Sequence, residues 1–239
     1  MALKARPLTL APALLALVMG LWPASAFQQP SIHPLTGRHI AGVCGAGPCA
    51  TWLERPEREQ EEKPEAALDA LNLKPGMVVA DVGAGSGYMS VKLARRVGPA
   101  GRVYAEDVQP EMLEKVRANS ARAGLKNIQT VQGTFTDPKL PALQMDLVLL
   151  VDVYHEFSEP QKMLHGIRDS LKADGRLVLL EYRGEDPSIP ILPEHKMTVA
   201  QVKTELEAEG FRLGPVIETL PRQHILILTK AAAAKAAGR

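Results

Sequence analysis

The fold is decided by the stretch Val78-Val79-Ala80-Asp81-Val82-Gly83-Ala84-Gly85-Ser86-Gly87-Tyr88. Its first five residues are apolar apart from one aspartate, which is typical of a short buried strand. Glycines then follow at alternate positions, and a helical pattern begins at Ser86. Glycine permits backbone conformations that other residues resist and lets the backbone approach a ligand closely. The stretch therefore predicts a strand, a ligand-binding loop and a helix in direct succession.

Strands and helices alternate from this stretch to near the C-terminus. Seven strands are predicted, over 78–82, 103–107, 128–132, 147–151, 176–182, 211–218 and 223–229. Helical patterns are predicted over 86–97, 110–123, 161–171 and 199–209. Repeated strand–helix units form a parallel sheet with helices on both faces, and two strands joined by a short turn run antiparallel. We therefore predict an α/β fold with a Rossmann-like, seven-stranded, mostly parallel sheet that contains one antiparallel strand.

Acidic residues lie on both sides of the predicted glycine loop. Glu106 and Asp107 end the second strand, beside the loop. A carboxylate there can accept hydrogen bonds from both ribose hydroxyls of an adenosyl ligand, or it can be a solvated loop acid. Asp81, just before the glycines, either fixes the loop or reaches the amino group of the ligand. A dinucleotide-binding loop would need glycine where Tyr88 stands, which disfavours a nicotinamide-dependent oxidoreductase.

From about residue 71 to residue 230 the sequence resembles the class I S-adenosylmethionine-dependent methyltransferases. The stretch 81–87 is similar to the first motif of that family, and Asp107 with the following Pro110-Glu111-Met112-Leu113 is similar to its strand-2 acid motif. The resemblance implies that S-adenosylmethionine is the cofactor and that Asp107 chelates its ribose. It also implies that the glycine loop lines the methionine and ribose part of the cofactor, through Gly83, Ala84, Gly85 and Gly87.

Two further cofactor contacts are predicted after the third and fourth strands. Many relatives have a Gly-Asp pair after strand 3 whose acid binds the adenine amino group, but this chain has Gly133-Thr134. The adenine contact then falls to Thr134, to backbone groups or to Asp137. Asp152 ends the fourth strand, and we assign it to the cofactor as well.

The segment Tyr154-His155-Glu156-Phe157 follows the fourth strand, in a loop that faces the transferring methyl group in this family. Methyl transfer requires positioning, and also a base where the nucleophile must lose a proton. We predict that His155 is the catalytic base or orients the acceptor, because the pKa of histidine lies near neutrality, with Glu156 and Tyr154 assisting. The alternative is that His155 and Glu156 cap the next helix or bind each other. Similar Tyr-His-x-Phe segments occur in methyltransferases of the ubiquinone-biosynthesis type, which favours a small-molecule acceptor.

Three other elements are candidates for shaping the acceptor site. Glu181-Tyr182-Arg183 ends the fifth strand, at the ligand-binding edge of the sheet. His195 lies in a loop that is long enough to cover a site, although it can equally be a surface histidine. Trp52 and Arg55 either fold over the cofactor as a lid or belong to a solvated helix.

The N-terminal residues have the features of an export signal. Lys4 and Arg6 precede an uncharged apolar stretch, and Ala24-Ser25-Ala26 provides the small residues that a signal peptidase needs. We predict a signal peptide over 1–26 and an exported, periplasmic protein with no membrane span in its mature chain. The alternative is an uncleaved N-terminal membrane anchor.

Three regions are predicted behind this signal. They are an arm with helices over 27–73, a methyltransferase domain over 74–230 and a flexible Ala-rich tail over 231–239. Cys44 and Cys49 lie in the arm, where export favours a local disulfide. The alternatives are two buried thiols, or half of a metal site that nothing in the sequence completes. We therefore predict no metal site.

Composition limits the function. The chain has 239 residues, of which 46% are hydrophobic and 23% charged, with a net charge of +1. One catalytic domain with short extensions fits this length, and the even charge balance gives no sign of nucleic-acid binding. We predict methyl transfer from S-adenosylmethionine to a small-molecule acceptor. The alternative is a regulatory module that binds the cofactor without transfer, but residues 154–156 favour an enzyme because a binder needs no base there. The sequence leaves the oligomeric state open.

Overall fold

The computed structural model of the protein describes residues 32–232 of the chain, apart from the side chains of Pro48 and Cys49. The predicted signal peptide over 1–26, residues 27–31 of the predicted arm and residues 233–239 of the predicted tail lie outside the described residues. Within 32–232, no helix is long and apolar enough to cross a membrane.

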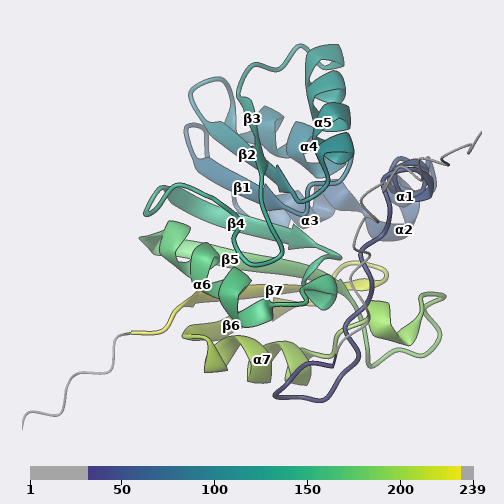
Figure 1. Ribbon diagram of the computed structural model, residues 1–239. Coiled ribbons are helices and arrows are strands. Elements are labelled where there is room, and N and C mark those ends of the chain that lie inside the picture. The colour runs from purple at the N-terminus through teal and green to yellow at the C-terminus, as the bar shows by residue number, and fades with distance from the viewer. Residues whose placement is uncertain (1–31, 233–239) are drawn as a thin grey trace, which may run out of the picture.

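The part of the chain that the structure describes is built on one seven-stranded sheet with the strand order β3-β2-β1-β4-β5-β7-β6 (Figure 1). The strands are β1 (Val78–Val82), β2 (Arg102–Asp107), β3 (Ile128–Gln132), β4 (Met145–Val151), β5 (Leu171–Tyr182), β6 (Phe211–Ile217) and β7 (Gln223–Lys230). All neighbours from β3 to β5 are parallel, whereas β7 is antiparallel to both β5 and β6. The predicted Rossmann-like sheet with one reversed strand is therefore confirmed.

Strand β4, at the centre of the sheet, is buried on both faces. Leu147 and Leu149 pack into the core on one face, and Val148 and Leu150 pack into the core on the other. Successive side chains of a strand point to opposite faces, so an uninterrupted apolar run fits a strand that helices cover on both sides.

Helices cover both faces of the sheet, as predicted. On one face lie α3 (Pro64–Ala70), α4 (Tyr88–Val97) and α5 (Pro110–Arg122), and on the other lie α6 (Pro160–Ser170) and α7 (Val199–Ala208) (Figure 1). Leu93 of α4 belongs to the first core, whereas Leu164 of α6 and Leu206 of α7 belong to the second. The carboxyl ends of the parallel strands therefore remain available at one edge of the sheet.

Strand β5 is longer than predicted. It begins at Leu171 rather than Arg176, so residues 173–175, whose Ala-Asp-Gly composition is typical of a turn, belong to the strand. The pairing of β5 with β4 shifts register between Met145 and Leu147. The Ala-Asp-Gly sequence is therefore part of an irregular strand, although its composition is typical of a turn.

The N-terminal arm, residues 32–73, runs across the carboxyl edge of the sheet (Figure 1). It contains α1 (Pro48–Leu53), α2 (Arg58–Glu62) and α3. The two helices α2 and α3 are separated at Lys63, which has a φ of 50° and precedes Pro64.

The arm is tied down at several points. The Arg38 guanidinium binds the Glu205 carboxylate of α7, with 2.9 Å between Nε and Oε1, and both side chains are buried. The backbone N–H of Ala41 donates to the carbonyl oxygen of His155 at 3.0 Å. Further along, the Gln109 side chain donates to the carbonyl oxygen of Cys44 at 3.0 Å. These contacts place the arm over the edge where the predicted site residues gather.

Candidate active site

The glycine loop lies between β1 and α4. Gly83, Gly85 and Gly87 all have positive φ, at 69°, 54° and 83°. A Cβ on Gly83 would lie 2.5 Å from a methyl carbon of Val153, so a larger residue would push the loop away from the segment after β4. Because Gly87 is left-handed, α4 begins only at Tyr88, later than predicted.

Asp107, at the end of β2, fixes the glycine loop and also lines a cavity. Its Oδ2 accepts a hydrogen bond from the Gly85 N–H at 2.9 Å, and its Oδ1 accepts one from the Gln109 N–H at 2.8 Å. Burial raises the pKa of Asp107, and these backbone donors act against the rise. Each carboxylate oxygen has two acceptor positions, so both oxygens can still bind a ligand hydroxyl.

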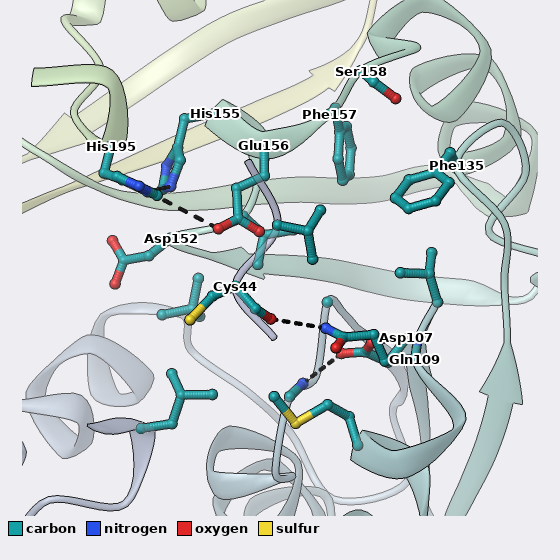
Figure 2. Close-up of a pocket in the computed structure, with 18 of the residues that line it drawn as sticks. Cys44, Asp107, Gln109, Phe135, Asp152, His155, Glu156, Phe157, Ser158 and His195 are labelled. Atoms are coloured by element: carbon teal, nitrogen blue, oxygen red, sulfur yellow. Dashed lines mark hydrogen bonds and ion pairs between the residues drawn. The ribbon is translucent and has the colours of Figure 1, made fainter. Parts of the chain in front are cut away.

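The cavity has a volume of about 580 Å³ and extends from the glycine loop to two short 3₁₀ helices, η1 (Tyr154–Glu156) and η2 (Pro193–His195) (Figure 2). Ligand pockets of enzymes commonly have this size. Five of the predicted cofactor residues line the cavity, namely Gly83, Gly85, Asp107, Thr134 and Asp152. Three others are not among its lining residues, namely Asp81, Ala84 and Gly87.

Asp81 and Ala84 support the glycine loop from behind. The buried Asp81 accepts a hydrogen bond from Ser90 Oγ at 2.5 Å, which joins the end of β1 to the first turns of α4. Burial raises the pKa of Asp81 from 3.8 to about 6. The Ala84 N–H donates to the carbonyl oxygen of Glu106 at 2.7 Å. Of the two roles predicted for Asp81, its position supports loop fixing.

Asp152 presents a buried acceptor to the cavity. It follows β4 with a φ of 54°, and its Oδ2 accepts a hydrogen bond from Gln223 Nε2 at 2.7 Å. Its Oδ1 is buried and has no hydrogen-bond partner among the described residues. Burial and the nearby carboxylates of Glu62 and Glu181 raise the pKa of Asp152 well above its usual value. A buried acceptor of this kind fits a cationic or N–H group of a ligand.

Glu106 is a second buried acid in the cavity wall, and the sequence pattern did not assign it a separate role. Its Oε2 accepts a hydrogen bond from the Gly83 N–H at 3.3 Å, and its Oε1 has no partner among the described residues. A Cβ on Gly133 would lie 1.8 Å from this Oε1, so glycine at that position makes room for the carboxyl group. Burial and the neighbouring Asp107 raise the pKa of Glu106 well above its usual value. The only signal in the sequence was the presence of two acids in succession.

His155 lies at the other end of the cavity and links two more elements (Figure 2). Its Nδ1 is 2.6 Å from Oε2 of Glu181 on β5, and its Nε2 is 3.0 Å from Nδ1 of His195 on η2. The other carboxylate oxygen of Glu181 accepts the Tyr154 N–H at 2.9 Å. We call this hydrogen-bonded series the Glu181–His155–His195 chain. Both ring nitrogens of His155 are therefore engaged by residues other than Glu156.

The charges around this chain favour different protonation states for its members. Burial disfavours a charged His155, but the charge and hydrogen bond of Glu181 outweigh burial and raise the pKa of His155. Burial and the nearby His155 lower the pKa of His195. Glu156 Oε1 lies 4.0 Å from His195 Nδ1, and burial raises the pKa of Glu156 to about 7.

Tyr154 does not take the place predicted for it. Its side chain is fully buried, and it is not among the residues that line the cavity. Its hydroxyl donates to Glu205 Oε2 at 2.9 Å, and its ring packs edge-on against Phe157 with 5.7 Å between the ring centroids. This position does not support the assisting role predicted for Tyr154, because its side chain packs in the core and does not line the cavity.

The end of β5 contributes two of its three predicted residues. Glu181 holds His155, and Tyr182 lines the cavity and donates its hydroxyl hydrogen to Glu62 Oε1 at 2.9 Å. Arg183 instead pairs with Glu218, with 2.8 Å between Nε and Oε2, and is not a lining residue.

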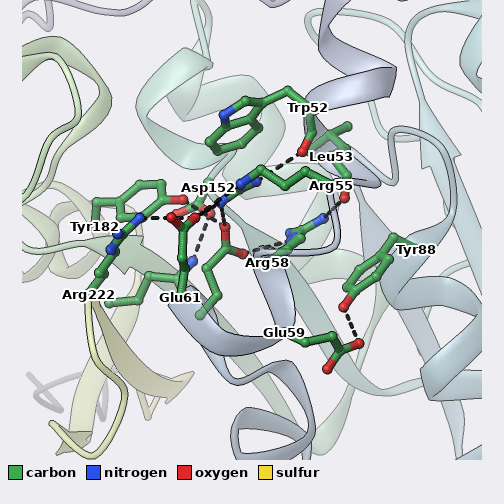
Figure 3. A network of polar contacts seen from close by, with 12 residues as sticks. Trp52, Leu53, Arg55, Arg58, Glu59, Glu61, Tyr88, Asp152, Tyr182 and Arg222 are labelled. Carbon is green, nitrogen blue, oxygen red and sulfur yellow. Dashed lines mark hydrogen bonds and ion pairs between the residues drawn. The ribbon is translucent and has the colours of Figure 1, made fainter.

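Trp52 closes one side of the cavity from the N-terminal arm. The Arg55 guanidinium stacks on the Trp52 ring, 3.8 Å from its centroid (Figure 3). Arg55 also forms ion pairs with Glu61 and Glu62, at 2.8 and 2.7 Å. Of the two alternatives predicted for Trp52 and Arg55, the position of Trp52 in the cavity wall, with Arg55 stacked on its ring, favours the lid.

Cys44 is a further arm residue in the cavity wall. It is disulfide-bonded. The bridge was predicted between Cys44 and Cys49, and the side chain of Cys49 lies outside the described part of the structure.

Known proteins share this architecture. The sequence model of the family described as "Methyltransferase domain" matches residues 73–222. A solved structure, the S-adenosylmethionine-dependent methyltransferase from Aquifex aeolicus, superposes with a TM-score of 0.73 at 29% identity, and the match covers 80% of this chain and 100% of that chain.

The names of two curated relatives indicate different methyl acceptors. The ubiquinone/menaquinone biosynthesis C-methyltransferase UbiE of Vibrio vulnificus is 28% identical over 166 residues, covering 64% of this chain and 64% of UbiE. The protein-L-isoaspartate O-methyltransferase of Methanothrix thermoacetophila is 32% identical over 111 residues, covering 46% of this chain and 50% of that enzyme. The chain thus spans between half and two thirds of the length of these two relatives. It belongs to the methyltransferase domain family, with the fold and the cofactor, S-adenosylmethionine, of a class I S-adenosylmethionine-dependent methyltransferase.

Proposed function

We propose that the protein transfers a methyl group from S-adenosylmethionine to a small-molecule acceptor that must lose a proton. The observation that carries this proposal is the Glu181–His155–His195 chain, which ends in the same cavity that Asp107 and the glycine loop line. A site that only binds the cofactor has no use for such a chain.

Residues at the β1 and β2 end hold the cofactor in this proposal. When bound, S-adenosylmethionine provides an electrophilic methyl group on a sulfonium sulfur. Asp107 binds the ribose hydroxyls, and the backbone at Gly83 and Gly85 approaches the ligand closely. Asp152 Oδ1, for which no described residue is a donor, accepts a hydrogen bond from a nitrogen of the ligand. These contacts position the ligand, which is the chief requirement of an in-line displacement.

His155 is the proposed base. The N–H at Nδ1 of His155 donates a hydrogen bond to Glu181, which leaves the lone pair on Nε2 as the basic site. In this structure that lone pair faces Nδ1 of His195. A bound acceptor either replaces His195 at Nε2 or passes its proton through the His195 ring. The carboxylate of Glu181 stabilises the imidazolium that forms.

The shape of the cavity favours a small acceptor over a protein. Apolar side chains line the acceptor end, including Phe135, Phe157, Ile191 and Leu192. Trp52 and other arm residues also line the cavity, so a side chain of a folded protein would have to enter past the arm. A compact, largely apolar molecule meets no such obstacle.

The experiment is to incubate the purified protein and S-adenosylmethionine labelled on the methyl group with cell extract separated into dialysable and protein fractions. We expect label in a dialysable product, whose mass identifies the acceptor, and little label with the His155→Gln variant. Label in the protein fraction alone would replace the small acceptor with a protein acceptor. Binding of S-adenosylhomocysteine without transfer to either fraction would identify a non-catalytic module.

We also propose that the protein is exported. The charged start, the apolar stretch and Ala24-Ser25-Ala26 support export, and so does the disulfide at Cys44. Intact-mass measurement of the protein from its native host should give a chain that begins at Phe27. A mass that includes residues 1–26 would favour the membrane-anchored alternative.

A further inference from the structure

We propose that His155, Glu156 and His195 form a binding site for a divalent transition-metal ion at the acceptor end of the cavity. Each residue offers one ligand atom, and the three atoms lie within 4.8 Å of one another. The two imidazole nitrogens, His155 Nε2 and His195 Nδ1, are 3.0 Å apart, and Glu156 Oε1 lies 4.0 Å from His195 Nδ1. Figure 2 shows the three side chains converging on one point at the cavity wall.

The distances are close to those that a shared ion requires. Metal–nitrogen bonds of about 2.0–2.1 Å and metal–oxygen bonds of about 2.0–2.2 Å place neighbouring ligand atoms roughly 3–3.5 Å apart. The imidazole pair already meets this separation. Glu156 must move closer by a rotation of its side chain. The His195 side chain on η2 is 30% exposed, which leaves it free to adjust as well.

The surroundings of His155 provide an independent argument. A histidine that binds a metal usually donates its other ring N–H to a carboxylate, which fixes the orientation of the ring. Glu181 Oε2 takes this position, 2.6 Å from Nδ1 of His155. Glu181 is fully buried and is itself held by the Tyr154 N–H, so Nε2 of His155 is aimed at the cavity by a rigid support.

The ligand set indicates which ions fit. Two imidazoles and one carboxylate suit first-row transition metals such as Zn²⁺, whereas Mg²⁺ and Ca²⁺ prefer sites made only of oxygen. Three protein ligands leave at least one coordination position open, as in catalytic metal sites. All three residues line the cavity, so the open position faces the space of the acceptor.

The sequence predicted no metal site because the ligands are far apart along the chain. His155 and Glu156 are adjacent on η1, but His195 lies on η2, after all of β5. No local spacing connects the two 3₁₀ helices.

The site also restricts which acceptors the protein can methylate, an inference that rests on the proposed function. A cation there would lower the pKa of an acceptor hydroxyl or thiol, and so would take over the activation that His155 otherwise performs. It favours acceptors with an oxygen or sulfur donor at the methylated atom or beside it.

The test is metal binding by the untagged full-length protein after chelator treatment. Zn²⁺ alone is titrated in competition with a chromogenic chelator, without cofactor or acceptor. We expect one equivalent to bind, His195→Ala and Glu156→Gln to weaken binding by at least about 100-fold, and Glu181→Gln to weaken it by about 10- to 100-fold. His165→Ala is the matched control, because His165 is exposed on α6 and paired with Glu209.

Cobalt gives a second readout in the same proteins. Co²⁺ should produce visible absorption bands in the wild type that are lost in His195→Ala, while far-ultraviolet circular dichroism shows both proteins folded. Wild-type binding no tighter than that of His195→Ala, or unchanged binding in Glu156→Gln, would overturn the proposal. Neither titration uses S-adenosylmethionine. A failure to bind metal would therefore not contradict the proposed methyl transfer, and a failure to transfer methyl would not contradict metal binding.

Discussion

The two ends of the cavity are built in different ways. The centre of the cofactor end comes from one β-α-β segment, in which the Gly85 N–H of the β1–α4 loop donates to the Asp107 carboxylate at the end of the neighbouring β2. The acceptor end brings together η1, β5 and η2 through the side chains of His155, Glu181 and His195. The first arrangement depends on the geometry of adjacent strands, whereas the second depends on how distant segments pack.

This difference has a functional meaning. Backbone groups of one loop can hold a fixed cofactor, whereas different acceptors require different side chains on the loops around them. We therefore expect substitutions at the two ends to separate binding of the cofactor from turnover.

The largest effect is expected from His155→Gln. Loss of a catalytic base lowers turnover by roughly 10²–10⁴-fold, and loss of an acceptor-binding metal ligand would act in the same direction. Steady-state kinetics with the identified acceptor measures the loss. The control is His165→Gln, an exposed histidine on α6 that should retain wild-type turnover. Unaltered turnover and acceptor affinity in His155→Gln would leave this residue with a structural role alone.

The next largest effect is expected from Asp81→Asn, and it concerns the stability of the protein rather than its turnover. Burial raises the pKa of Asp81 from 3.8 to about 6, so the folded protein holds this proton more tightly than the unfolded chain does. The resulting stabilisation is complete below about pH 4 and is lost as the pH rises through about 6, a change of about 3 kcal/mol.

Asparagine stays neutral and does not undergo this change. The free energy of unfolding of Asp81→Asn, relative to wild type, should therefore rise by up to about 3 kcal/mol between pH 4 and pH 7. Urea unfolding at both pH values provides the measurement. An identical pH dependence in the two proteins would show that Asp81 ionises normally.

The smallest effect on turnover is expected from Tyr154→Phe. The variant loses the hydroxyl that donates to Glu205, which should lower the free energy of unfolding by about 1.5–3 kcal/mol. Turnover of the folded variant should stay near that of wild type, because Tyr154 does not line the cavity. Thermal unfolding and kinetics test the two parts, and a large fall in turnover without loss of stability would restore the catalytic role predicted from the sequence.

Sequence patterns were sufficient for the fold, and five of the eight cofactor residues that they predicted line the cavity. The apolar strand before Gly83, the alternate glycines and the acid at Asp107 are signals within one β-α-β unit, where local geometry determines which groups meet. The predictions at Asp81 and Ala84 placed both residues at the loop but did not show that they support it from behind. The β5 boundary was misplaced because 173–175 has the composition of a turn although the sheet keeps it in a strand.

The acceptor end was only partly predictable. His155 stood out because of its residue type and its position after a buried strand, but nothing in the spacing showed that Glu181 and His195 bind its two ring nitrogens. The buried position of Tyr154 was not predicted, because neighbours on a 3₁₀ helix point in different directions and the sequence does not show which of them enters the core. The buried pair of Arg38 and Glu205, which holds the arm in place, has no signal at all.

The separation of the two ends is tested most directly by calorimetric titration of S-adenosylhomocysteine into wild type, Asp107→Ala and His155→Gln. Asp107→Ala removes the acceptor of the ribose hydroxyls and should weaken binding by about 1.5–3 kcal/mol, or about 10- to 150-fold. The His155→Gln variant should bind S-adenosylhomocysteine almost as tightly as wild type, because residue 155 lies at the other end of the cavity from Asp107. Absence of binding to wild type at millimolar ligand, or equal weakening in both variants, would contradict this account of the cavity.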